Sequence, residues 1–109
     1  MQTLRIRRRN TTRSGTDFSN FDEWIVWQNA ATIPGLNSAL WRQDACGAYM
    51  YRYAYGDTNN IYGWEIDHIV PVAHLGGDDW GNLQALHWKN NRFKSDSLHQ
   101  NYCVISYGA

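Results

Sequence analysis

The chain has 109 residues, which is enough for one small folded domain and too few for two. A hydrophobic fraction of 43% and six tryptophans are typical of a chain that folds around a core and exclude a disordered one. No stretch approaches the roughly 20 apolar residues of a membrane span, and no apolar run follows the N-terminal arginines. We therefore expect no membrane association, no secretion signal and a cytoplasmic location.

The formal net charge is zero, but the charges are unevenly distributed. Five of the ten basic residues lie in the first 13 positions, where there is no acid, so an acidic remainder carries ten acids against five bases. Residues 1–17 are also rich in Asn, Thr, Ser and Gly, which predicts a flexible basic arm before a domain over 18–109. The arm either binds a polyanion or is a solvated tail. The arginines with a predicted substrate-binding role are Arg5, Arg7, Arg8 and Arg9.

The first third of the domain has one predicted helix. Apolar and aromatic residues at helical spacing predict it over 18–31, with Asp22 and Glu23 suited to its first turn. A strand over 24–27 is the alternative. After the Pro34-Gly35 turn, Asn37 is a candidate cap for a short helix reaching residues 41–43.

Later elements are clearer. Alternating residues predict a strand over 48–53. The last block predicts a strand over 64–70, a loop over 71–81, a strand over 83–88, a helix over 89–98 and a short edge strand over 102–107. The expected fold is thus a single small α+β domain.

A chemically informative group of residues lies in this last block. Asp67 and His68 are adjacent on the predicted strand, and Asn91 is on the helix that follows. Phosphodiester hydrolysis needs a base for the attacking water and a positive charge for the phosphoryl and leaving oxygens. Imidazole titrates in the range of a base at neutral pH, and hard cations need only one or two oxygen ligands from protein. The group therefore predicts metal-assisted phosphodiester cleavage.

Neighbouring residues fit the same chemistry. His87, Asn91 and Ser95 are four apart, so they share one face if the helix begins early enough. Arg92 and Lys94 lie next to that face and are candidates for holding the substrate phosphate. A slip of one residue would put the neighbouring Asn90 in place of Asn91, and the spacing favours Asn91.

One difficulty concerns Asp67 and His68. Side chains that follow each other on a regular strand point to opposite faces, so a helix on one face meets only one of them. For both to reach one phosphate, we expect twist or an irregularity near Pro71. An asparagine at position 82 could hydrogen-bond nearby backbone and fix the loop that carries His68.

Residues 62–96 resemble the HNH endonucleases, whose active site is the ββα-metal (His-Me) finger. The resemblance rests on Asp67-His68, Pro71, Gly76-Gly77, Asn82-Leu83 and Asn91-Arg92-x-Lys94, in that order. It implies a ββα-metal core at about 62–98, with His68 as general base, Asn82 as the loop-orienting asparagine, and Asp67 and Asn91 as metal ligands. It also implies one Mg²⁺-like ion and products with 5′-phosphate and 3′-hydroxyl ends. We expect DNA as the substrate.

The sequence departs from the family where many members carry two C-x-x-C pairs for a structural zinc. His87 and Asn90 stand where the second pair would fall, so we expect no such zinc and keep His87 as the alternative metal ligand. An oxygen-rich ligand set favours Mg²⁺ or Mn²⁺. Cys46 and Cys103 form no C-x-x-C pair; free thiols and a disulfide both stay open.

Two other functions fit the same residues. One is a nucleic-acid-binding module that kept the scaffold without the chemistry, and the other is an antibacterial effector nuclease. The intact Asp67, His68 and Asn91 favour an enzyme. Oligomeric state is open, and a dimer would make double-strand cleavage easier.

Overall fold

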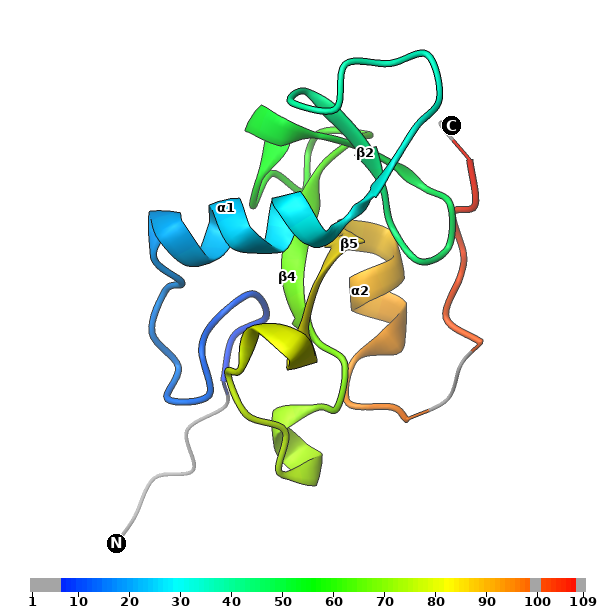
Figure 1. Ribbon diagram of the computed structural model, residues 1–109. Helices are drawn as coiled ribbons and strands as arrows, with labels where there is room; N and C mark the ends of the chain where they lie inside the picture. Colours follow the sequence, from blue (N-terminus) through cyan, green and yellow to red (C-terminus); the bar gives the residue numbers. More distant parts are fainter. Residues whose placement is uncertain (1–6, 99–100, 108–109) are drawn as a thin grey trace, which may run out of the picture.

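The computed structural model describes residues 7–98 and 101–107 (Figure 1). In chain order these residues form two α-helices, five strands and three short 3₁₀ turns, which confirms the predicted α+β class. The elements are α1 (Asn20–Asn29), β1 (Ala31–Thr32), β2 (Trp41–Gln43), β3 (Tyr49–Tyr51), a turn at Arg52–Ala54, β4 (Trp64–His68), turns at Val72–His74 and Trp80–Asn82, β5 (Leu83–His87) and α2 (Trp88–Lys94).

Helix α1 confirms the helix predicted over 18–31 and excludes the alternative strand. Ser19 caps it: its hydroxyl accepts from the Asp22 N–H at 3.1 Å, while the Asp22 carboxylate accepts from the Ser19 N–H at 3.3 Å. This capping box satisfies two backbone donors that a helix start leaves unpaired. The helix buries Val26 and Trp27.

A three-stranded antiparallel sheet follows, in the order β1-β2-β3. The helix predicted to reach residues 41–43 is wrong, since these residues form β2. Asn37 does accept a hydrogen bond two residues on, from the Ala39 N–H at 2.9 Å, but it makes an isolated turn and no helix. The strand predicted over 48–53 is confirmed only as far as Tyr51, where a 3₁₀ turn begins.

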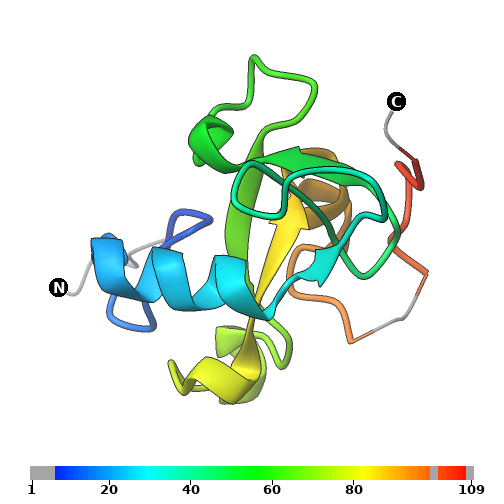
Figure 2. The same ribbon diagram turned by 45° about the horizontal axis from the view of Figure 1, so that its top comes forward.

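The second sheet is the antiparallel hairpin β4–β5, and both of its strands were predicted. All five residues of β4 are buried. Figure 2 shows α1 crossing one face of the hairpin, with α2 behind it. Helix α2 is shorter than predicted because Ser95 adopts a left-handed φ of 48° and ends it.

The core lies between α1 and the hairpin. The rings of Trp27 and Trp64 are 5.1 Å apart, and both side chains are fully buried. Their burial fits the expectation that large side chains fill the core of a small domain. Trp80 and Trp24 are exposed.

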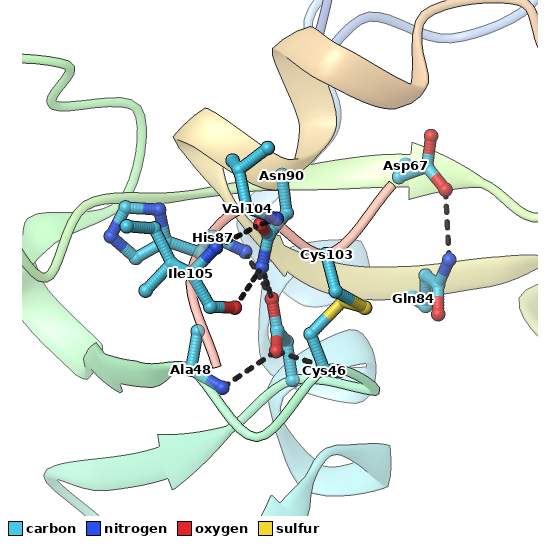
Figure 3. Close-up of a disulfide and its surroundings, with 10 residues drawn as sticks. Cys46, Ala48, Asp67, Gln84, His87, Asn90, Cys103, Val104 and Ile105 are labelled. Carbon is cyan, nitrogen blue, oxygen red and sulfur yellow. Dashed lines mark hydrogen bonds between the residues drawn. A yellow bond between two sulfur atoms is a disulfide. The ribbon is translucent and has the colours of Figure 1, made fainter. Parts of the chain in front are cut away.

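The C-terminal residues 101–107 form no strand, so the predicted edge strand over 102–107 is wrong. They are held instead by a disulfide between Cys46 and Cys103 and by Asn90 (Figure 3). The Asn90 amide accepts from the N–H groups of Val104 and Ile105 at 2.8 and 2.9 Å and donates to the Ile105 carbonyl. The Asn90 side chain thus makes the backbone hydrogen bonds that a neighbouring strand would make with an edge strand.

The N-terminal residues 7–17 pack against the body, where the sequence predicts a flexible arm. The Asn10 side-chain oxygen accepts from the Ile66 N–H at 2.8 Å and from the Tyr55 hydroxyl at 2.9 Å. Thr11 is 1% exposed and bridges to Asp17. Composition alone does not reveal these buried polar contacts.

Arg5 lies outside the described residues. Within the described part of the chain, no helix is long and apolar enough to cross a membrane.

Candidate active site

A cleft of about 680 Å³ lies between the N-terminal segment, β4 and the end of α2. Its walls bring together residues that are far apart in sequence. They are Arg7, Arg8, Arg9, Asn10, Thr11, Asp17, Gly56, Glu65, Ile66, Asp67, His68, Asn91, Ser95 and Asp96. Three predicted site residues of the hairpin and helix thus share one cleft with three predicted arginines of the arm.

The position of this cleft accounts for the difficulty raised by Asp67 and His68. Strand β4 pairs with β5 along one edge; on its other edge Trp64 bridges to Tyr55, and the Ile66 N–H donates to Asn10. Asp67 points toward α2, whereas the His68 ring lies 5.9 Å from that of Phe18 on the opposite face. The cleft runs along this second edge and is lined by residues of both faces of β4, so no irregularity near Pro71 is needed.

Asp67 is 6% exposed and accepts two side-chain hydrogen bonds. Gln84 donates to Oδ2 at 2.9 Å, and the Lys94 ammonium lies 3.2 Å from the same oxygen. Burial raises the pKa of Asp67 above its ordinary value, and the Gln84 hydrogen bond and the Lys94 charge offset only part of that rise. A carboxylate in this position gains strongly from a further positive charge.

Glu65 is a further residue of the candidate site. It precedes Asp67 by two residues, so both side chains lie on the α2 face of β4. Its carboxylate accepts from the Asn91 amide nitrogen at 2.9 Å. Because a carboxylate only accepts, this contact fixes the amide orientation and leaves the Asn91 carbonyl oxygen as the atom suited to a cation.

These donors fit a hard divalent cation. Asp67, Glu65 and Asn91 offer only oxygen atoms as ligands, and all three are buried and line the cleft. In the described ranges, no three His, Cys, Asp or Glu residues group closely enough to hold a metal. A cation here would therefore use the amide of Asn91 and retain water ligands, as Mg²⁺ commonly does.

His68 is 3% exposed, and its Nε2 lies 2.7 Å from Oδ1 of Asp78. Asp78 was not singled out from sequence, although it directly follows the Gly76-Gly77 pair. Its carboxylate also accepts from the Arg13 N–H, at 2.9 Å to Oδ1 and 3.2 Å to Oδ2. A packed N-terminal segment thus supports the loop beside the imidazole.

Asn82 closes that loop. Its side-chain oxygen accepts from the Val70 N–H at 2.8 Å, and its nitrogen donates to the carbonyls of Val70 and Gly77 at 3.1 and 2.9 Å. The backbone at Gly76 can lie close to the Val70 carbonyl because glycine has no Cβ. A Cβ there would lie 1.7 Å from the Val70 carbonyl oxygen. The arrangement is the one expected of a loop-orienting asparagine.

Besides Asn82, three other predicted site residues among those described do not line the cleft. His87 caps α2: its Nδ1 accepts from the Lys89 N–H at 3.1 Å, and its Nε2 donates to the Ile61 carbonyl at 2.7 Å. Both ring nitrogens are therefore engaged, as expected of a packing residue rather than a ligand. Lys94 is 4% exposed and paired with Asp67, and the Arg92 guanidinium lies 4.9 Å from the Trp88 ring centroid on the outer face of α2.

Comparison with known proteins bears on the hairpin and α2 only. No curated protein and no solved structure matches the chain. The family model described as HNH endonuclease matches residues 56–97, a segment that contains β4, β5 and α2. This match confirms the resemblance seen in the motif residues. It identifies residues 56–97 as similar to an HNH endonuclease domain, which points to a nuclease-type function.

Proposed function

We propose that the chain is a metal-dependent endonuclease that hydrolyses phosphodiester bonds in DNA. The observation that carries the proposal is the shared cleft, which Asp67, His68 and Asn91 line together with Arg7, Arg8 and Arg9. In this proposal β4, β5 and α2 form a ββα-metal core. The arginines of the cleft would hold the phosphate backbone beside the groups that carry out the chemistry.

In the proposed reaction, His68 is the general base. Its neutral imidazole removes a proton from the attacking water, and the resulting hydroxyl oxygen displaces the 3′ oxygen from phosphorus. The products carry 5′-phosphate and 3′-hydroxyl ends. Asp67 and Asn91 would hold one divalent cation, Mg²⁺ or Mn²⁺, which when bound would offset charge on the phosphoryl and leaving oxygens.

Supercoiled plasmid provides the direct test. We expect the purified protein to nick it with Mg²⁺ or Mn²⁺ and to leave it intact with EDTA. Linear DNA would indicate double-strand cleavage, and parallel incubation with RNA would show whether DNA is the preferred substrate. Intact plasmid after incubation of folded protein with either metal would contradict the proposal and favour a binding module.

Replacing Asn91 with alanine should raise the Mg²⁺ concentration needed for half-maximal cleavage by tenfold or more, about the change seen when a metal site loses one supporting group. The reason is that the variant removes one of few protein oxygens available to the cation. A Mg²⁺ titration of the initial rate measures the effect.

Asn90→Ala is a poor control for this variant because Asn90 supports the C-terminal segment. Ser95→Ala, also in the cleft, is better matched. An unchanged Mg²⁺ requirement would remove Asn91 from the ligand set.

Replacing Arg8 and Arg9 with glutamine should weaken DNA binding and its dependence on salt. The slope of log K against log [salt] should fall by about 0.9 for each phosphate that the variant no longer neutralises. Arg7 is kept because it donates to the Thr11 carbonyl at 2.9 Å and supports the segment. Fluorescence anisotropy with a labelled duplex gives the slope. Arg13→Gln, outside the cleft, is the control; if it lowers the slope as much, the arginines act only through net charge.

A further inference from the structure

We propose that Asp78 positions the His68 imidazole so that Nδ1 is the nitrogen that takes the proton from water. This role rests on the proposed nuclease function. The starting observation is the 2.7 Å contact between His68 Nε2 and Asp78 Oδ1. A carboxylate only accepts hydrogen bonds, so Nε2 carries the hydrogen in this contact. In a neutral ring of that tautomer, Nδ1 is the basic nitrogen.

The Asp78 carboxylate is itself held in place from two directions. The Arg13 N–H donates to both of its oxygens, at 2.9 and 3.2 Å. The preceding residue, Gly77, is fixed by the Asn82 side chain, which donates to its carbonyl at 2.9 Å. A carboxylate fixed this way can hold the ring against rotation, whereas a mobile one could not.

The charge of Asp78 also suits the proton transfer. When Nδ1 receives the proton from water, the ring becomes positively charged while the hydroxyl oxygen bonds to phosphorus. The bond from phosphorus to the leaving oxygen breaks, and that oxygen takes up a proton from solvent. A carboxylate 2.7 Å from Nε2 stabilises the imidazolium that forms. Asp78 touches neither water nor phosphate in this scheme.

Asp79 provides a matched control. It is the adjacent residue with the same charge, it is exposed, and within the described structure its side chain makes no hydrogen bond or ion pair. Replacing either aspartate therefore changes the charge of the loop equally, but only Asp78→Ala removes the hydrogen bond to His68.

The test compares Asp78→Ala, Asp78→Asn and Asp79→Ala in cleavage of a duplex oligonucleotide. We expect Asp78→Ala to lower kcat by about 10- to 100-fold with KM and the Mg²⁺ requirement unchanged. The kcat of Asp78→Asn should lie between those of the wild type and Asp78→Ala, because the amide oxygen still accepts from Nε2 but carries no charge. Asp79→Ala should resemble the wild type. Two-dimensional ¹⁵N NMR should show the Nε2–H tautomer of His68 in the wild type and a mixture in Asp78→Ala.

A kcat for Asp78→Ala equal to that of Asp79→Ala would overturn the role of Asp78. An NMR spectrum in which the His68 tautomer does not change would overturn it as well. A wild-type protein without cleavage would instead overturn the proposed function, and the positioning role with it. Loss of activity together with a raised Mg²⁺ requirement would make Asp78 a metal ligand and contradict the positioning role.

Discussion

Replacing His68 with alanine is expected to lower the cleavage rate by about 10² to 10⁴, the range that a positioned acid or base contributes. The imidazole lines the cleft beside Asp67 and is held by Asp78, so no other described histidine can take its place. Initial rates of plasmid nicking at saturating Mg²⁺ give the factor. DNA binding by the variant should persist, because Arg7, Arg8 and Arg9 are unchanged.

His74→Ala is the control for this variant. His74 lies in the same loop region, in the 3₁₀ turn at Val72–His74, but its side chain is exposed and does not line the cleft. Because His68 is buried, the folding of His68→Ala must be verified by circular dichroism and thermal unfolding. A folded His68→Ala protein that cleaves as fast as His74→Ala would assign the base to another group.

The hairpin and its helix could be predicted from sequence because their signals are local. Trp64–His68 and Leu83–His87 have strand-forming residues separated by turn residues, and Asn91 falls at helical spacing after them. Asp67, His68 and Asn91 could be found for the same reason: one continuous stretch of chain delivers them to the cleft. The family match over 56–97 covers this same stretch.

The contacts that sequence reasoning missed are those between distant segments. Asp78 meets Arg13 from 65 positions away, and Asn10 meets Ile66 from 56 away. No periodicity marks such pairs, and the composition of residues 1–17 resembles that of a solvated tail. The Gly76-Gly77 pair could have drawn attention to Asp78, since a carboxylate beside a sharp turn near a histidine is a natural orienting group.

The disulfide bears on the location expected from the sequence. Disulfides persist in oxidising compartments and are rare in the cytosol. The cytoplasmic location therefore stays a prediction, and the Cys46–Cys103 bond is a feature that bears on it.

Removing the disulfide with the double variant Cys46→Ser/Cys103→Ser is expected to lower the free energy of unfolding by about 4 kcal/mol. The two cysteines are 57 residues apart. A cross-link over that length lowers the conformational entropy of the unfolded chain, which corresponds to about 4 kcal/mol of stability. For a chain of this size the melting temperature should fall by about 15 °C or more. Thermal and urea unfolding measure the change. Wild-type protein in reductant should behave like the double variant, and an unchanged melting temperature would contradict the prediction.

Cleavage should also slow, because the disulfide fixes residues that touch the candidate site. Beside Cys103, burial raises the pKa of Tyr102, a hydrogen bond with Gln84 partly offsets the rise, and the charge of Asp67 adds to it. Gln84 in turn donates to Asp67 (Figure 3). Without the disulfide, Tyr102 would be held beside Gln84 and Asp67 mainly by the hydrogen bonds of Asn90 to the C-terminal segment.

Reductant should therefore lower the wild-type cleavage rate at temperatures where the protein remains folded. The same reductant should leave the rate of the double variant unchanged, since it has no bond to break. Equal rates for oxidised and reduced wild-type protein would show that the candidate site keeps its geometry without the C-terminal segment.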